Sequence, residues 1–440
     1  MAGERDFCVT DFGARGGGPA PEHPAFQRAI DACVRAGGGR VRVPAGRYLC
    51  GGLTLGSGLE LRLEAGAVIR ASTRVEDYAH LPLPVLFYAR DSERITLRGP
   101  GRVDGQATGQ VPWPRPKFRR RTLYFDSCRS VRVEEAAFEN SDSWTLHFFR
   151  CERVEVRKVE ILNDPEHINS DGIDPDSSRD VIISDCHIRA GDDCVVLKSN
   201  SPEHPCENIV VTGCRLETTC SALKLGTESR GAIRQVSFNN CVITNTPLAL
   251  ACFMKDGGCY EDVLFEDIRI ETADRLGHPE WPIFVDLNLR TETSAPGRIR
   301  NLRFRNLEIV SSGTCLIQGL RRRPVEALRL QDILFRAAGP VDFSRRLKMN
   351  GGRQEAHSQL EDYARTPAYF ILANVDDFGL ENLRLESVGP ELPAGLHDLA
   401  LLNCRCGRVA GLENRIRFTG PRLDPVLTEE TPAGSVEFPG

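Results

Sequence analysis

The amino-acid sequence predicts an all-β protein that folds as a parallel β-helix, a solenoid in which each turn of the chain adds a layer of short strands. A phrase of alternating apolar residues recurs along the middle of the chain, and Gly, Asn, Asp, Ser and Pro fill the stretches between its copies. Alternation is typical of strands with one buried face, and these five residue types favour turns. The copies are VRVEEAAF from Val131, VEVRKVEI from Val154, VIISDCHI from Val181, IVVTGCRL from Ile209, VSFNNCVI from Val236, VLFEDIRI from Val263 and LRFRNLEI from Leu302.

The spacing of these copies corresponds to one coil of a solenoid. Successive copies begin 23, 27, 28, 27, 27 and 39 residues apart, and a period of about 20 to 30 residues is typical of solenoid repeats. Cys186, Cys214 and Cys241 hold the same place in three copies, which predicts an inward ladder of small apolar side chains rather than a metal or redox site. The step of 39 residues predicts an inserted loop near residues 272–298, in which Trp281 would wall a groove.

The two ends of the chain differ from its middle. Residues 24–36 read PAFQRAIDACVRA and place their apolar side chains on one helical face; Gly37 to Gly39 then end the helix. We expect this helix to cover the open edge of the first coil, because an uncovered edge pairs with other chains. Residues 390–440 are irregular apart from LALLNC and are expected to cover the other end. The prediction is a single domain over residues 1–440 with about ten coils.

Composition and charge narrow the function classes. The chain has 440 residues, of which 41% are hydrophobic and 27% charged, and its net charge is -5. No basic surplus indicates nucleic acid or a membrane as partner. The N-terminal residues lack the apolar run of a secretory signal, and the 16 cysteines show no zinc-ligand spacing. These features predict free thiols in a cytoplasmic protein, or a secreted one if a leader has been removed.

Two dense acidic phrases lie about one coil apart and are the candidates for chemistry. The first contains Asn169, Asp171 and Asp174, and the second contains Asp192 and Asp193. Asp171 and Asp192 are 21 residues apart, so stacking would bring several carboxylates together and raise the pKa of at least one. A protonated carboxyl beside an ionised one is what glycoside hydrolysis requires. The alternatives are a pair of turns capped by Asp and Asn side chains, and a calcium site.

Cationic residues follow on the next coils. Lys224 and Lys255 stand at the ends of strand-like phrases and are expected to neutralise a sugar carboxylate or donate to hydroxyl groups. Lys198 and Glu228 are further candidates of this kind. His167 and His147, on preceding coils, are either structural or substrate-facing. Arg119, Arg120 and Arg121 follow Trp113 and are expected to form an exposed basic loop.

These residues resemble a known family. VTDFGA, AFQRAIDAC, GGGRVRVPAGRYL and LELRLEAGAVI are similar to the N-terminal region of pectin-degrading β-helix enzymes. NSDGIDPDSSRDVIISDCHIRAGDDCVVLKS resembles the core of glycoside hydrolase family 28, the polygalacturonases and their relatives. The resemblance covers roughly residues 6 to 310. It implies a right-handed parallel β-helix that hydrolyses glycosidic bonds with inversion.

The resemblance also implies roles for single residues. Asp192 matches the general acid, whereas Asp171 and Asp193 match the carboxylates that hold and activate water. Asn169 matches the Asn-x-Asp motif, and Lys255 matches the lysine of the Arg-x-Lys pair. The residue pattern itself, not the resemblance, adds Asp174, His167, Lys224 and Glu228 to the residues assigned to substrate binding. No metal or other cofactor is expected.

Two motifs depart from the family pattern. The family has a Gly-His-Gly motif where this chain has Cys220-Ser221-Ala222, and an Arg-x-Lys pair where it has Phe253-Met254-Lys255. The expected substrate is therefore a short, imported, pectin-related oligosaccharide of uronate or rhamnogalacturonan type, cleaved from one end. A lyase that eliminates across a uronate and a non-catalytic carbohydrate-binding β-helix remain the alternatives, and the oligomeric state is not predicted.

Overall fold

The computed structural model describes residues 5–112, 114–291, 293–343, 363–389, 391–393 and 395–439. The chain divides into two compact units, residues 1–196 and 197–440, and the division falls inside strand β19 (Val195–Ser199). The prediction of a single domain stays a prediction. In the described residues, no helix is both long and apolar enough to cross a membrane.

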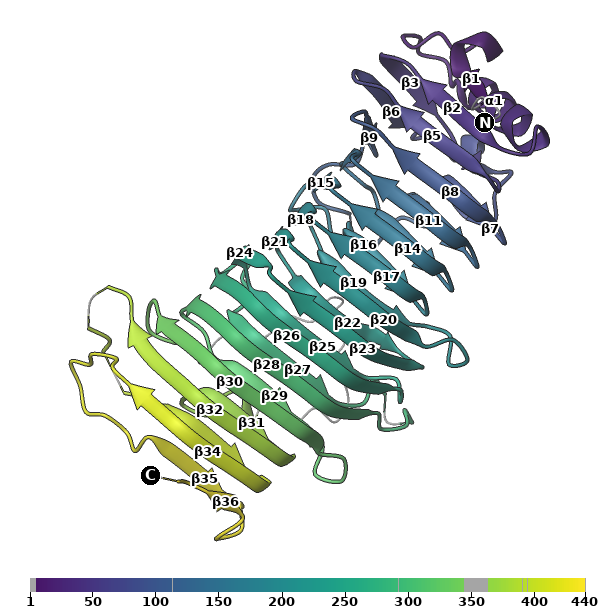
Figure 1. The fold of residues 1–440 in the computed structure, drawn as a ribbon. Coiled ribbons are helices and arrows are strands. Elements are labelled where there is room, and N and C mark those ends of the chain that lie inside the picture. Colours follow the sequence, from purple (N-terminus) through teal and green to yellow (C-terminus); the bar gives the residue numbers. More distant parts are fainter. Residues whose placement is uncertain are drawn as a thin grey trace. The chain divides into compact units, whose positions relative to one another are not determined.

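The first unit begins with the predicted helix. Helix α1 (His23–Arg35) buries Phe26, Ile30 and Cys33 on one face and follows strand β1 (Asp6–Cys8) and the 3-10 helix η1 (Val9–Phe12). Beyond it, Gly37 and Gly38 adopt positive φ angles of 86° and 113°, which glycine reaches without strain. Figure 1 shows α1 beside the first strands of the unit, and the prediction of a helix over residues 24–36 is confirmed.

Three parallel rows of strands make up the rest of the first unit, so each coil contributes three strands. The first row is β2 (Gly39–Val43), β5 (Leu59–Leu63), β8 (Glu93–Arg98), β11 (Arg129–Glu134), β14 (Glu152–Arg157) and β17 (Arg179–Ser184). The second is β3 (Gly46–Cys50), β6 (Ala67–Ala71), β9 (Arg102–Asp104), β12 (Ala137–Glu139), β15 (Glu160–Leu162) and β18 (His187–Ala190). The third is β4 (Leu53–Thr54), β7 (Val85–Arg90), β10 (Arg121–Asp126), β13 (Leu146–Phe149), β16 (Ile173–Asp176) and the start of β19, and a second 3-10 helix, η2 (Val75–Tyr78), precedes β7.

The second unit continues the same architecture with longer strands. Two short strands, β21 (Arg215–Thr218) and β24 (Val242–Thr246), belong to the second row. In later coils one long strand takes the place of the separate strands of the first and second rows. The first row is β20 (Cys206–Thr212), β23 (Ala232–Asn239), β26 (Cys259–Thr272), β28 (Arg298–Ser311), β30 (Val325–Ala337), β32 (Val375–Ser387), β34 (Arg405–Asn414) and β36 (Val436–Glu437). The third is β22 (Ser221–Ser229), β25 (Leu248–Met254), β27 (Trp281–Leu287), β29 (Cys315–Gln318), β31 (Ala368–Ala373), β33 (His397–Leu402) and β35 (Val426–Glu429).

The register of the strands confirms the predicted repeat. In the first unit, Val131 pairs with Val154 and Val154 with Val181. In the second unit, the phrase starts pair in the same way, Ile209 with Val236, Val236 with Val263 and Val263 with Leu302. Every predicted phrase thus occupies its expected place. The third row has 13 strands among the described residues, however, so the estimate of about ten coils was too low.

The inserted loop and the irregular tail are not as predicted. Residues 272–298 contain strand β27, so the extra residues are divided between two shorter loops. Trp281 begins this strand, is 6% exposed and packs edge-on against Phe284 in the core, so it walls no groove. Strands β33, β34 and β35 lie in the predicted covering tail and pair with earlier strands as further coils. Trp113 lies outside the described residues.

The cysteines behave as small apolar residues. All 16 are free, and Cys186, Cys214 and Cys241 are each about 1% exposed, as the ladder prediction requires. Aromatic residues occupy a similar ladder in the second unit, where the ring of Phe265 stacks between Phe238 and Phe304 at centroid distances of 4.9 and 5.1 Å. Burial of such ladders stabilises the register of the coils.

Candidate active site

Three aspartates come together in the first unit where two loops meet. Asp171 ends the loop before β16, and Asp192 and Asp193 lie in the short turn before β19. The amide of Gly172 donates to the carbonyl of Asp193 at 2.8 Å, and that of Ile173 to Cys194 at 2.9 Å. This pairing places Asp171 level with Asp193, not with Asp192 as the 21-residue spacing suggested. Carboxylate oxygens of Asp192 and Asp193 lie within 4.8 Å of each other.

The two loops are held together by small side chains. Ser170 donates from its hydroxyl to the carbonyl of His167 at 2.6 Å and accepts from the amide of Gly191 at 3.1 Å. A Cβ atom at Gly191 would lie 2.4 Å from the carbonyl oxygen of His167, so the turn has no room for a side chain there. The close approach sets the position of Asp192, the next residue.

Asn169 holds the carboxylate of Asp192. The backbone amide and side-chain Nδ2 of Asn169 both donate to Oδ2 of Asp192, at 3.0 and 3.2 Å. The backbone of Asn169 has a φ of 60°, which turns its own amide toward the carboxylate, and asparagine tolerates this conformation well. Two donors on one oxygen favour the other oxygen, Oδ1, as the place for a proton. This geometry leaves Oδ1 as the oxygen that can carry and donate a proton.

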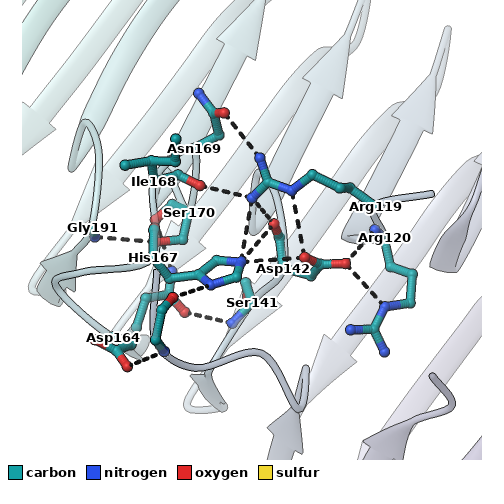
Figure 2. Close-up of polar contacts among 12 residues, drawn as sticks. Arg119, Arg120, Ser141, Asp142, Asp164, His167, Ile168, Asn169, Ser170 and Gly191 are labelled. Carbon is teal, nitrogen blue, oxygen red and sulfur yellow. Dashed lines mark hydrogen bonds and ion pairs between the residues drawn. The ribbon is translucent and has the colours of Figure 1, made fainter. Parts of the chain in front are cut away.

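Arg119 orients Asn169. Its Nη1 donates to Oδ1 of Asn169 at 2.9 Å, and its Nη2 donates to the carbonyl of Ile168 at 2.7 Å (Figure 2). Because a guanidinium only donates, it binds the amide oxygen and leaves Nδ2 directed at Asp192. Arg119 is mostly buried and also contacts the Asp142 carboxylate at 3.5 Å. The expectation of an exposed arginine loop is therefore wrong at this position.

His167 and Asp142 anchor the loop that carries Arg119. Nδ1 of His167 donates to the carbonyl of Gly109 at 2.8 Å, and Nε2 lies 3.2 Å from Oδ1 of Asp142. Asp142 also accepts from the backbone amide of Arg120 at 2.9 Å, as Figure 2 shows. Both ring nitrogens of His167 thus face the protein. His167 is 6% exposed and holds loops together instead of meeting a substrate, contrary to its assignment.

In the pair of His167 and Asp142, burial and hydrogen bonding shift the pKa of each residue in opposite directions. Burial alone would lower the pKa of His167, but the hydrogen bonds to Asp142 and Gly109 outweigh it and raise that pKa above 6.5. Burial alone would raise the pKa of Asp142, but the contacts with His167 and Arg120 lower it well below 3.8. Each partner therefore favours the charged form of the other.

Arg121, the first residue of β10, lies beside the acidic residues. Its guanidinium donates from Nη1 to Nδ1 of His147 at 3.0 Å, and Nε2 of His147 lies 3.4 Å from the carboxylate of Asp176. Since the guanidinium only donates, Nδ1 accepts and His147 is neutral with its proton on Nε2. His147 pairs in register with Asp174, which is fully buried. Asp174 is thus part of the wall beneath the site.

The second unit holds the predicted cations, which differ from one another. Lys198 lies 3.3 Å from the carboxylate of Glu228. The positive charge of Lys198 lowers the pKa of Glu228 to about 2; burial opposes this shift, and the charge of Lys224 adds to it. The ammonium of Lys224 lies 5.1 Å from the ring centroid of Phe253, the residue that replaces the family's arginine. Lys224 is 9% exposed, so a cation–π contact covers most of it.

Lys255 does not match its predicted role. Its side chain is fully buried, and its ammonium group forms an ion pair with Asp286, whose other oxygen accepts from Gln318. A buried ammonium with a carboxylate partner has its charge compensated inside the protein. The assignment of Lys255 to a sugar carboxylate is therefore contradicted by the structure of the second unit.

The residues that sequence reasoning missed are Arg119, Arg121 and Asp142. One signal was present, because Asn140-Ser141-Asp142 repeats the phrase Asn169-Ser170-Asp171 about one coil earlier. The repetition places a second aspartate in a loop beside the first. The partners of Arg119, Asp142 and Asn169, lie 23 and 50 residues away in the sequence, and no local pattern reveals them.

Comparison with known proteins identifies the family. Residues 33–308 match the model of glycosyl hydrolases family 28. A probable polygalacturonase of Vitis vinifera is 27% identical over 60% of this chain and 60% of its own, so the match spans less than two thirds of that relative. An exopolygalacturonase of Platanus acerifolia is 25% identical over 70% of this chain and 83% of its own.

Solved structures agree with this result. A hyperthermoactive exopolygalacturonase from Thermotoga maritima is 26% identical and covers 76% of this chain and 87% of its own, with a TM-score of 0.66. A polygalacturonase from Erwinia carotovora, 18% identical over 73% of this chain and 93% of its own, shares the fold with a TM-score of 0.61. The predicted class, a right-handed parallel β-helix, is confirmed. The chain belongs to glycosyl hydrolase family 28.

Proposed function

We propose that the protein hydrolyses a glycosidic bond in a pectin-related oligosaccharide by acid–base catalysis with inversion. The observation that carries the proposal is the carboxyl group of Asp192, held on one oxygen by two N–H donors of Asn169 and set beside Asp193. Asp192 protonates the leaving oxygen from Oδ1. Asp171 and Asp193, which lie level in the segments before neighbouring strands, hold and activate the attacking water.

The preferred substrate in this proposal is a short oligosaccharide with an acidic sugar, cleaved from one end. Two of the similar proteins are named exopolygalacturonases, which supports exo action on such a substrate. The chain has Ser221 and Phe253 where the family pattern has its histidine and arginine, so contacts with a long galacturonan chain are reduced. Trp281 gives no support to this proposal, because it lies in the core. Import of the substrate into a cytoplasm stays a prediction.

A panel of pectic oligosaccharides, followed by NMR of the released anomers, tests the proposal. The expected result is stepwise release of one terminal unit with the inverted anomer appearing first. The carboxylates of Asp192 and Asp193, within 4.8 Å of each other, are about as close as the catalytic pair of retaining enzymes, about 5–5.5 Å. The anomer is therefore the deciding measurement, and initial appearance of the retained anomer would contradict inversion.

The same panel separates the alternative functions. An unsaturated product that absorbs ultraviolet light and disappears on chelation would identify a lyase. Binding of the oligosaccharides without any product would identify a non-catalytic carbohydrate-binding protein. Rapid random shortening of polygalacturonate would contradict exo action.

A further inference from the structure

Arg121 differs from the arginines around it because no carboxylate among the described residues lies within ion-pair distance of it, although Asp174, Asp176 and Asp171 lie near enough to raise its pKa. Arg119 and Arg120 both contact Asp142, and Arg150 forms an ion pair with Asp126 at 2.6 Å. In the described part of the chain, Arg121 forms no ion pair, and its hydrogen bond goes to the neutral ring of His147. A guanidinium has five N–H donors, and His147 accepts from one of those of Arg121.

Two aromatic rings hold this guanidinium in place. Its central carbon lies 4.7 Å from the ring centroid of Trp144 and 5.1 Å from that of Tyr124. Tyr88 stacks on Tyr124 at 6.2 Å with an angle of 19° between the rings. All three aromatic residues are half-buried. A rigid guanidinium between rings loses little conformational freedom when it binds a ligand.

The place of Arg121 relative to the aspartates is set by the strand register. Tyr88, Tyr124, His147 and Asp174 lie side by side on four successive strands of the third row. The aromatic pair thus leads directly to the acidic residues. Burial lowers the pKa of Arg121, the nearby carboxylate of Asp174 raises it, and arginine stays charged in either case.

We propose that Arg121, together with the rings of Tyr124 and Trp144, forms a subsite for the carboxylate of a uronic acid residue of the substrate. The planar guanidinium binds a carboxylate through two parallel hydrogen bonds, and the ring faces pack against the apolar face of a pyranose. The subsite lies within the first unit. This inference rests on the proposed function, since it assigns an acidic sugar to the same site.

The test compares oligogalacturonate with its methyl ester as substrates of the full-length protein. Arg121→Gln keeps a hydrogen-bond donor near His147 but removes the charge. It is expected to lower kcat/KM for the free acid about 10- to 100-fold and to leave the ester within about twofold. Arg121→Lys keeps the charge without the planar fork and is expected to retain part of the preference. The unfolding midpoint of each variant shows that the fold is intact.

Arg150→Gln is the matched control, because Arg150 also stacks on an aromatic ring, that of Phe149 at 4.7 Å, but is already paired with Asp126. Arg150→Gln should leave the ratio of kcat/KM for the free acid to kcat/KM for the ester unchanged. If the wild type cleaves the acid and Arg121→Gln slows both substrates equally, the subsite is refuted and the proposed function stands. If the wild type neither cleaves nor binds either substrate, with binding measured calorimetrically on Asp192→Asn, both proposals fail together.

Discussion

At the scale of single residues, Asp192 is the position at which a change should matter most. Asp192→Asn cannot donate a proton to the leaving oxygen, so hydrolysis should fall by about 100- to 10,000-fold. Asn169 can still bind the amide oxygen that replaces Oδ2, so the fold should persist. Turnover of the best oligosaccharide measures the effect. Asp185→Asn, an exposed position on the same coil, should keep full activity, and comparable activity of the two variants would move the acid elsewhere.

Arg119 should act on the reaction through Asn169, whose side chain it orients. Arg119→Gln frees the amide of Asn169 to rotate, which removes one N–H donor from the Asp192 carboxylate. Because those donors favour the ionised form, their loss should raise the pKa of Asp192 and move the alkaline limb of the kcat profile to higher pH. We expect kcat to fall about tenfold with little change in KM. Arg120→Gln, which also loses a contact with Asp142, should leave that limb in place.

The residue types in the sequence were sufficient to predict that the three aspartates lie together but not to find the partners of the cations. Asp171, Asp192 and Asp193 lie together because a repeat of known length fixes which residues stack. A charged side chain in isolation gives no sign of its partner, so Lys255 was assigned to substrate although Asp286, 31 residues later, neutralises it. Arg121 was placed on the surface for the same reason. The pairing depends on side-chain direction, which strand alternation predicts only within a strand.

At the scale of elements, the loops around the site should depend on pH through His167 and Asp142. The raised pKa of His167 stabilises the fold fully below pH 6.5, and this contribution is lost as pH rises through the raised value. The lowered pKa of Asp142 stabilises the fold above pH 3.8, and this contribution is lost as pH falls through the lowered value. His167→Gln should therefore lower the unfolding midpoint by about 2–4 °C near pH 5, and by less at pH 8. An equal effect at both values would rule out the charged pair.

The stacked rings of the second unit should dominate its core. Phe265→Ala removes a ring between two others and should cost about 3–5 kcal/mol in the free energy of unfolding, measured by denaturant titration. Val242→Ala, at a position that is 37% exposed, should stay within about 0.5 kcal/mol of the wild type. A similar cost for both would show that the stack contributes no more than a surface contact.

The elements were predictable where the repeat was regular and not elsewhere. Seven phrases share an apolar alternation and similar intervals, so their register follows from the sequence. The next partners are Leu328 and Phe378, which pair with each other in register although they are 50 residues apart, so this longer coil hides the repeat in the sequence. Residues 390–440 contain many prolines and charges between short strands, and the strands there are recognised only by their partners. Pairing across the coils, not local propensity, makes them strands.

At the scale of the whole molecule, sixteen free thiols give a direct test of the packing. A thiol reagent should modify Cys406 quickly, Cys8, Cys220 and Cys259 more slowly, and the remaining buried cysteines only in denaturant. A hydrogen bond to Asp376 raises the pKa of Cys406, so the fast phase should accelerate as pH rises. Cys406→Ser should abolish that phase. Fewer than sixteen thiols in denaturant without reductant would indicate a disulfide.

The helix that covers the first coil has a consequence for how the protein is made. Synthesis on the ribosome proceeds from the N-terminus, so α1 and β1 are complete before β2 has a neighbour to follow it. Each later coil then pairs with the strand edge that the preceding coil exposes, and it exposes one new strand edge of its own. The nascent chain therefore exposes one growing strand edge, while the strands packed against α1 are covered from the start.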